Sequence, residues 1–134
     1  TEEKMKSAKG TETILVVEDD ESARSVIEMG LTKYGYHIIT AKNGEEAIQL
    51  FKQNQAAIDL ILTDVIMPKI GGRQVAEEIL SIDASTRIIY MSGYTDDEII
   101  RQGILDQEIP FIQKPFDIQT LTKRIRSQLD RENK

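Results

Sequence analysis

The sequence predicts a single α/β domain, a three-layer α/β/α sandwich built around a five-stranded parallel sheet. Short aliphatic runs alternate with longer amphipathic segments from Thr13 onward, which is typical of strands buried on both faces and joined by helices. The length of 134 residues suits one ordinary domain and is too short for two. We expect residues 12–130 to form this domain, residues 1–11 to be a polar linker or a cloning remnant, and residues 131–134 to be a polar tail.

Five aliphatic runs are the expected strands. The first run contains no polar side chain, which suits a strand with both faces buried. Because a helical segment separates each run from the next, the connections should be right-handed crossovers that leave all strands parallel. In chain order, the predicted strands are residues 14–17, 36–40, 60–62, 87–91 and 110–112.

Five helices are expected from capping residues and from the helical spacing of apolar side chains. Asn43 with Glu46, and Thr95 with Glu98, have the spacing of capping boxes at helix starts. Gly35 is expected to end the first helix, because glycine readily adopts the left-handed backbone found there. In chain order, the predicted helices are residues 21–34 after Asp20, a segment after Asn43, a segment with its centre at 74–80, a segment from Thr95 ended by Gly103, and a last helix capped by Asp117.

Composition limits the partners and the compartment. The chain carries 17 Lys and Arg against 23 Asp and Glu, and its net charge of −6 disfavours binding to nucleic acid or to an anionic membrane. Cysteine is absent, no run approaches the roughly 18 apolar residues of a membrane span, and residues 1–10 lack the apolar core of a signal peptide. We therefore expect a cytoplasmic domain. The basic side chains Lys123, Arg124 and Arg126 are expected to form a solvated face that complements the last helix dipole.

Acidic residues follow the first and third predicted strands. Ligands bind to open α/β sheets outside the carboxyl ends of the strands, so Glu18, Asp19 and Asp64 should face one crevice. Neighbouring carboxylates repel one another unless a cation lies between them. Oxygen ligands without nearby histidine or cysteine favour Mg²⁺.

Groups suited to phosphoryl transfer follow the fourth and fifth predicted strands. Lys114 adds a positive charge and Ser92 a hydroxyl donor, and together they can hold a phosphoryl group. Asp64 is then the expected covalent acceptor. It precedes a tight loop in which Gly71 and Gly72 are expected to supply freedom of backbone conformation.

Four motifs in these places resemble the receiver domain of two-component signalling proteins. They are VVEDD at 16–20, LTDVIMP at 62–68, MSGY at 91–94 and QKPF at 113–116, in the order and approximate spacing of that family. The likeness extends from about Thr13 to Leu129. It implies a flavodoxin-like sheet with strand order 2-1-3-4-5.

The resemblance also implies how the acidic residues act. By it, Asp64 is the phosphorylated aspartate, Asp19 binds Mg²⁺ directly, Glu18 binds it through water, and the backbone carbonyl of Ile66 is a further ligand. Glu18 replaces the commoner Asp of the family. Since the apolar side chain of Ile66 cannot orient an attacking water, we predict a fairly long-lived phosphoaspartate.

The remaining expected site residues concern the phosphoryl oxygens and a switch. The resemblance implies that Ser92 hydrogen-bonds a phosphoryl oxygen, that Lys114 is the lysine of the family, and that the peptide bond from Lys114 to Pro115 is cis. It also implies that Ser92 and the aromatic Phe111 move together when the domain is phosphorylated. Phe111 lacks the hydroxyl of the tyrosine that many relatives carry, so its ring cannot form a hydrogen bond.

The expected phosphoryl donor is a histidine kinase or a histidine phosphotransfer domain. His37 is the only histidine of the chain, at the edge of the second predicted strand, and is expected to be structural, so the phosphohistidine must belong to a partner. The segments MSGYTDDEI and IPFIQKPFDIQTL are also similar to receivers at the carboxyl end of hybrid sensor histidine kinases. We expect a monomer or a weak dimer.

Three alternatives remain at the level of sequence. A degenerate receiver would act only as a docking module, although the acceptor site is complete. A hydrolase of the haloacid-dehalogenase type usually has a second Asp two residues after its nucleophile, where this chain has Ile66. A flavin-binding electron carrier would need a Ser, Thr or Gly-rich phosphate loop after the first strand, where this chain has three acids.

Overall fold

A computed structural model describes residues 9–93 and 110–131 and confirms the predicted sandwich. Five parallel strands form one sheet in the order β2-β1-β3-β4-β5. The strands are β1 (Thr13–Val17), β2 (His37–Ala41), β3 (Ile58–Asp64), β4 (Arg87–Ser92) and β5 (Phe111–Gln113). The helices are α2 (Glu21–Lys33), α3 (Gly44–Gln53), α4 (Gly72–Ile82) and α6 (Ile118–Leu129). The helix expected from Thr95 to Gly103 lies outside the described residues.

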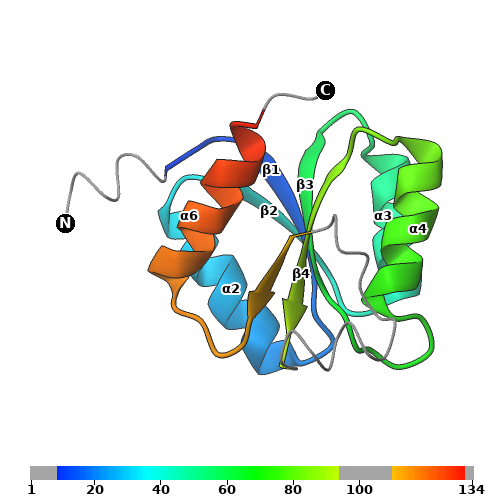
Figure 1. Cartoon of the computed structure of the whole chain (residues 1–134), viewed down its shortest axis with the longest axis horizontal. Helices are drawn as coiled ribbons and strands as arrows, with labels where there is room; N and C mark the ends of the chain where they lie inside the picture. The colour runs from blue at the N-terminus through cyan, green and yellow to red at the C-terminus, as the bar shows by residue number, and fades with distance from the viewer. Residues whose placement is uncertain (1–8, 94–109, 132–134) are drawn as a thin grey trace.

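Two helix layers cover the sheet. Figure 1 shows α2 and α6 on one face and α3 and α4 on the other. Residues of β1 alternate between the two cores, because Ile14 and Val16 pack on the side of α2 and α6 while Leu15 and Val17 pack on the opposite side. This explains why the run contains no polar residue. Among the described residues, no helix is long and apolar enough to cross a membrane.

The helix starts confirm three predicted caps. The side chain of Asp20 accepts a hydrogen bond from the N–H of Ala23, and Asp117 accepts one from Thr120 in the same way. Asn43 accepts from the N–H of Glu46 at 2.7 Å. The Glu46 carboxylate accepts from the N–H of Lys42, one residue before the position that a capping box would use.

The end of α2 shows why Gly35 is needed there. Gly35 has a φ of +100°, a backbone conformation that side chains rarely adopt. Its N–H donates to the carbonyl of Thr32, and the N–H of Tyr36 donates to the carbonyl of Leu31. These are the two bonds of a Schellman motif, and they place Tyr36 in the helix end rather than in β2, where we had expected it.

Strand β3 is longer than residues 60–62, which were the part visible in the sequence. It begins at Ile58 and ends at Asp64, and only Asp59 within it is exposed. The carboxylate of Asp59 accepts a hydrogen bond from the N–H of Thr13 at the start of β1. The aliphatic pattern stops at Leu62 because Thr63 and Asp64 are polar, but both side chains are buried. The strand therefore carries Asp64 to its last position.

Candidate functional site

The carboxyl ends of four strands bring the predicted site residues together. Glu18 and Asp19 directly follow β1, Asp64 ends β3, Ser92 ends β4, and Lys114 follows β5. Glu18, Asp64 and Ser92 are buried, Lys114 is partly buried, and Asp19 is exposed. The group is thus covered on the protein side and open toward solvent at Asp19.

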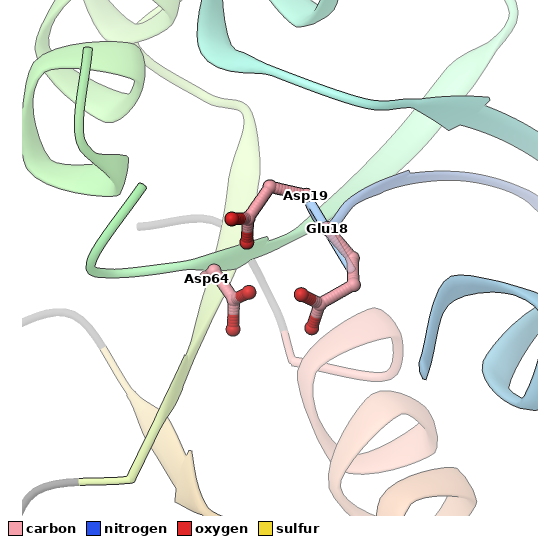
Figure 2. A group of neighbouring side chains, drawn as sticks. All are labelled: Glu18, Asp19 and Asp64. Atoms are coloured by element: carbon pink, nitrogen blue, oxygen red, sulfur yellow. The ribbon is translucent and has the colours of Figure 1, made fainter. Parts of the chain in front are cut away.

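Glu18, Asp19 and Asp64 form a cluster that we call the acidic rim. Each offers one carboxylate oxygen, and these oxygens all lie within 4.8 Å of one another. Figure 2 shows the three carboxylates turned toward a shared space, two from the end of β1 and one from the end of β3. Side chains 45 or more positions apart in the chain therefore meet, since β1 and β3 are neighbours in the sheet.

Lys114 joins two members of the acidic rim. Its Nζ lies 2.7 Å from Oε2 of Glu18 and 2.7 Å from Oδ1 of Asp64. Its backbone N–H donates to the carbonyl of Ser92 at 2.7 Å, so the end of β4 fixes the position from which the side chain extends. The following peptide bond, to Pro115, is cis.

Asp64 and Glu18 of the acidic rim differ in the direction of their pKa shifts. Burial raises the pKa of Asp64, and a hydrogen bond with Glu18 raises it further, so that it lies well above the usual aspartate range although Lys114 acts to lower it. Burial also acts to raise the pKa of Glu18, but hydrogen bonds with Asp64 and Lys114 outweigh it and lower this pKa. Burial acts to lower the pKa of Lys114, and its two carboxylate partners raise it. Without a metal ion, Asp64 therefore keeps its proton to a higher pH than Glu18 does.

The turn after β1 is fixed by hydrogen bonds to its backbone. The N–H of Glu18 donates to the carbonyl of Ala41 at 3.1 Å, and Oε1 of Glu18 accepts from the N–H of Asp20 at 3.1 Å. Nη1 of Arg24 donates to the carbonyl of Glu18 at 2.8 Å. Arg24 was not among the residues expected at the site. The available signal was a basic residue in the first turn of a helix that begins just after the acids.

The loop from β3 to α4 positions Asp64 from the other side. The N–H of Ile70 donates to the carbonyl of Pro68 across Lys69, which has a φ of 66°, so the chain makes a three-residue γ-turn here. Gly71 and Gly72 were expected to supply conformational freedom, and this was wrong, because neither has a positive φ. A Cβ atom on Gly72 would overlap the backbone carbonyl oxygen of Asp64. Glycine is required there for space.

Two further predicted residues lie beside the rim rather than in it. Ile66 follows Asp64 by two positions, and its side chain is 52% exposed. Phe111 begins β5, opposite Tyr90 of β4, and packs partly buried against the core on the side of α3 and α4. Its carbonyl accepts a hydrogen bond from Arg124 of α6.

The acidic rim fits a hard divalent cation. All of its donors are carboxylate oxygens, which Mg²⁺ prefers. When all groups are ionised, three carboxylates and the Lys114 ammonium leave two negative charges uncompensated. Oxygens on opposite sides of an octahedral Mg²⁺ are about 4.2 Å apart, so the observed spread requires only small shifts.

Comparison with protein families assigns the fold and its general function. Residues 14–126 match the response regulator receiver domain. The chain belongs to this receiver domain family. Receiver domains are phosphoacceptor domains of two-component systems, signalling domains rather than classical enzymes, and this chain is one of them. The match decides against the hydrolase and flavin alternatives.

Relatives of this receiver domain include a sensor kinase and a transcriptional regulator. The sensor kinase CckA of Brucella abortus (strain 2308) is 28% identical over 131 residues, which cover 98% of this chain and 14% of that protein. The probable transcriptional regulator ycf27 of Guillardia theta is 36% identical over 123 residues, which cover 92% of this chain and 47% of that protein. The chain thus spans less than half of either relative.

Solved structures show the same fold. The receiver domain from hybrid histidine kinase CckA superposes with a TM-score of 0.75 at 34% identity, covering 88% of this chain and 99% of that one. The response regulator TrrA from Thermotoga maritima, solved in complex with Mg²⁺-BeF, gives a TM-score of 0.75 at 30% identity over 88% of this chain and 99% of that one. Receiver domains bind Mg²⁺ at an acidic pocket and interact with histidine kinases or phosphotransfer proteins.

Proposed function

We propose that Asp64 is the phosphoryl acceptor of this receiver domain and that the donor is the phosphohistidine of a histidine kinase or a phosphotransfer domain. One observation carries the proposal. Asp64 is a buried carboxylate at a strand end, within 2.7 Å of Lys114 and next to two further acids. A receiver that had lost its acceptor site and acted only as a docking module would have no reason to keep this costly arrangement.

The proposed step is a displacement at phosphorus. An oxygen of the Asp64 carboxylate forms a bond to phosphorus while the bond from phosphorus to the donor nitrogen breaks, and the electron pair remains on the imidazole. Lys114 is placed to compensate charge on the phosphoryl oxygens, and the Ser92 hydroxyl to donate a hydrogen bond to one of them. A bound Mg²⁺ would supply further positive charge to the carboxylates and the phosphoryl group.

The contacts of the rim residues support direct binding of Mg²⁺ by some of them and binding through water by another. Both oxygens of Glu18 are engaged, one with the N–H of Asp20 and one with Lys114. This supports an indirect role for Glu18, through water. Asp19 is exposed, and we propose it as a direct ligand together with Asp64 and the backbone carbonyl of Ile66.

We propose that phosphorylation at Asp64 changes a partner-binding surface of the domain through movements of β4 and β5. Ser92 is buried at the end of β4, and its carbonyl is bound by the N–H of Lys114. A shift of Ser92 toward a phosphoryl group would therefore pull on the segment that follows β5. Phe111 lies on the same strand pair, and we propose that its ring moves with Ser92 and changes the surface offered to a partner.

The test is phosphorylation by acetyl phosphate with Mg²⁺, followed by intact-mass measurement. The bond from phosphorus to acetate breaks as the bond to Asp64 forms, so the expected gain is about 80 Da. We expect the gain in the wild type and not in Asp64→Asn. Asp59→Asn is the matched control, since Asp59 is an exposed aspartate on the same strand, and it should be phosphorylated normally. An equal gain in Asp64→Asn would refute the assignment.

A further inference from the structure

Arg24 makes a contact that links helix α2 to the acidic rim. Its backbone N–H donates to the carbonyl of Asp20 at 2.9 Å, so it lies in the first turn of the helix. Its side chain turns back along the chain, and Nη1 donates to the backbone carbonyl of Glu18 at 2.8 Å. The side chain is neither fully buried nor fully exposed.

This contact fixes the peptide group between Glu18 and Asp19. The N–H of Glu18 is already bound to the carbonyl of Ala41, at the end of β2. That N–H belongs to the preceding peptide group, between Val17 and Glu18, so the two hydrogen bonds hold the peptide planes on both sides of the Glu18 Cα atom. The bond from Arg24 is charge-assisted and therefore stronger than a neutral one. These two planes together set the direction in which the Glu18 side chain leaves the backbone, and the second of them also orients the chain that leads into Asp19.

We propose that Arg24 is a positioning residue for the acidic rim, which holds Glu18 and Asp19 in the orientation needed to bind Mg²⁺ and to receive a phosphoryl group at Asp64. The inference rests on the proposed function of the rim. Arg24 acts through the backbone of Glu18 and touches neither the metal nor the phosphoryl group.

A purely electrostatic role for Arg24 predicts the opposite result. The guanidinium places a positive charge against the backbone of Glu18, next to the acidic rim, so its removal without any change of geometry would tighten Mg²⁺ binding. Loss of positioning would weaken Mg²⁺ binding instead. The sign of the change in the dissociation constant therefore separates the two roles.

The experiment compares Arg24→Met and Arg24→Lys with the wild type. Calorimetric titration with Mg²⁺ gives the dissociation constant, at low salt and at roughly 0.5 M salt, where charge interactions reach only a few ångströms. We expect Arg24→Met to raise the dissociation constant about five- to tenfold at both salt concentrations, and Arg24→Lys to raise it about two- to threefold, because an ammonium keeps the charge without the planar fork. Phosphorylation by acetyl phosphate at saturating Mg²⁺ should slow about tenfold in Arg24→Met.

Lys33→Met is the matched control, since it removes one positive charge from the last turn of the same helix. Its Mg²⁺ affinity and phosphorylation rate should stay within about twofold of the wild type. Unchanged or tighter Mg²⁺ binding by Arg24→Met would overturn the proposal, even if the melting temperature falls. If Arg24→Met does not fold, Arg24→Lys decides, and wild-type affinity in that variant would overturn it too. If the wild type binds Mg²⁺ but takes up no phosphoryl group at Asp64, the proposed function fails while the titration still tests Arg24.

Discussion

The two ends of β1 carry charged clusters that differ in how well their charges balance. Before β1, Glu12 pairs with Arg126 of α6 at 2.6 Å, and Arg126 also pairs with Asp130 at 2.8 Å. We call these three residues the Arg126 cluster. Hydrogen bonds with Arg126 lower the pKa of Glu12, and those with Glu12 and Asp130 raise the pKa of Arg126. The Glu12 carboxylate is thus more stable charged than it would be in water.

At the other end of β1, Asp64 of the acidic rim shows the reverse. Burial and the neighbouring Glu18 raise the pKa of Asp64, and one lysine stands against three carboxylates, whereas one arginine stands against two in the Arg126 cluster. The Arg126 cluster stabilises the fold as it stands, whereas the acidic rim lacks positive charge until a cation or a partner supplies it. A buried carboxyl group that is hard to ionise, as Asp64 is, thus points to a site of chemistry, and one that ionises easily beside its partner, as Glu12 does, points to structure.

The largest effect should come from removing the one lysine of the rim. We expect Lys114→Met to slow phosphorylation by acetyl phosphate by on the order of a hundredfold or more, because no positive side chain then compensates the phosphoryl oxygens. Arg126→Met removes an equal charge from the Arg126 cluster and should leave the rate unchanged. The comparison breaks if both variants slow the reaction equally, as measured by the rate of mass gain.

Neutralising the acceptor should stabilise the metal-free fold. The pKa of Asp64 is higher in the folded than in the unfolded protein, so its contribution to stability is present below about pH 4 and is lost as the pH rises toward the folded value. We therefore expect Asp64→Asn to raise the free energy of unfolding in EDTA by about 1–3 kcal/mol at pH 8, and by less at pH 5. Urea denaturation measures it, and Asp59→Asn should change little. Equal gains at both pH values would contradict the assigned cause, and saturating Mg²⁺ should abolish the gain.

Substitutions in the Arg126 cluster should change the stability of the fold and leave the phosphorylation rate unchanged. Arg126→Met removes a two-point ion pair with Glu12 in which both side chains are partly buried, and we expect a loss of about 2 kcal/mol in the free energy of unfolding. Lys123→Met, at an exposed position on the same helix, should cost less than about 0.5 kcal/mol. The same urea titrations measure both variants. Equal losses would show that the cluster is only a surface ion pair.

The smallest effect concerns the lifetime of the phosphorylated state. An amide at position 66 can orient a water molecule toward the phosphoryl group, which the isoleucine cannot, so Ile66→Asn should shorten the half-life of the phosphoaspartate by a few fold. The measurement is loss of the added mass after acetyl phosphate is removed. Ile66→Val keeps an apolar side chain and should decay like the wild type. An unchanged or longer half-life in Ile66→Asn would contradict the prediction.

Sequence alone could predict the layers of the fold and the members of the rim for a physical reason. Strands buried on both faces are visible as unbroken aliphatic runs, and parallel strands bring the residues after them to one edge, so Asp64 and Lys114 were expected to meet. The carboxyl end of β3 was not visible, because Thr63 is polar yet completely buried. Pairing alone decides such a boundary.

Contacts that depend on the exact path of a side chain could not be predicted. Lys123, Arg124 and Arg126 appear in the sequence as one basic run and were expected to be a solvated face. This was wrong for Arg126, which is only partly exposed and binds Glu12. Lys123 and Arg124 are exposed as expected, although Arg124 also donates to the carbonyl of Phe111. Only the packing of α6 against the start of β1 distinguishes them. The contact of Arg24 with Glu18 was missed for the same reason.

The close approach of Gly72 to the backbone of Asp64 has a consequence for the evolution of this domain. A methyl group at position 72 would occupy the space of the Asp64 carbonyl oxygen, whereas a Cβ on Gly93, after β4, would meet no atom of residues 9–93 and 110–131 within 4 Å. Gly72 packs against the end of β3 and Gly93 directly follows β4, and both strands reach the rim. We nevertheless expect related sequences to retain Gly72 and to vary at position 93. A side chain at position 72 would disrupt the fold itself, because it would overlap the main chain of Asp64. Selection against it would therefore not depend on which partner the domain binds.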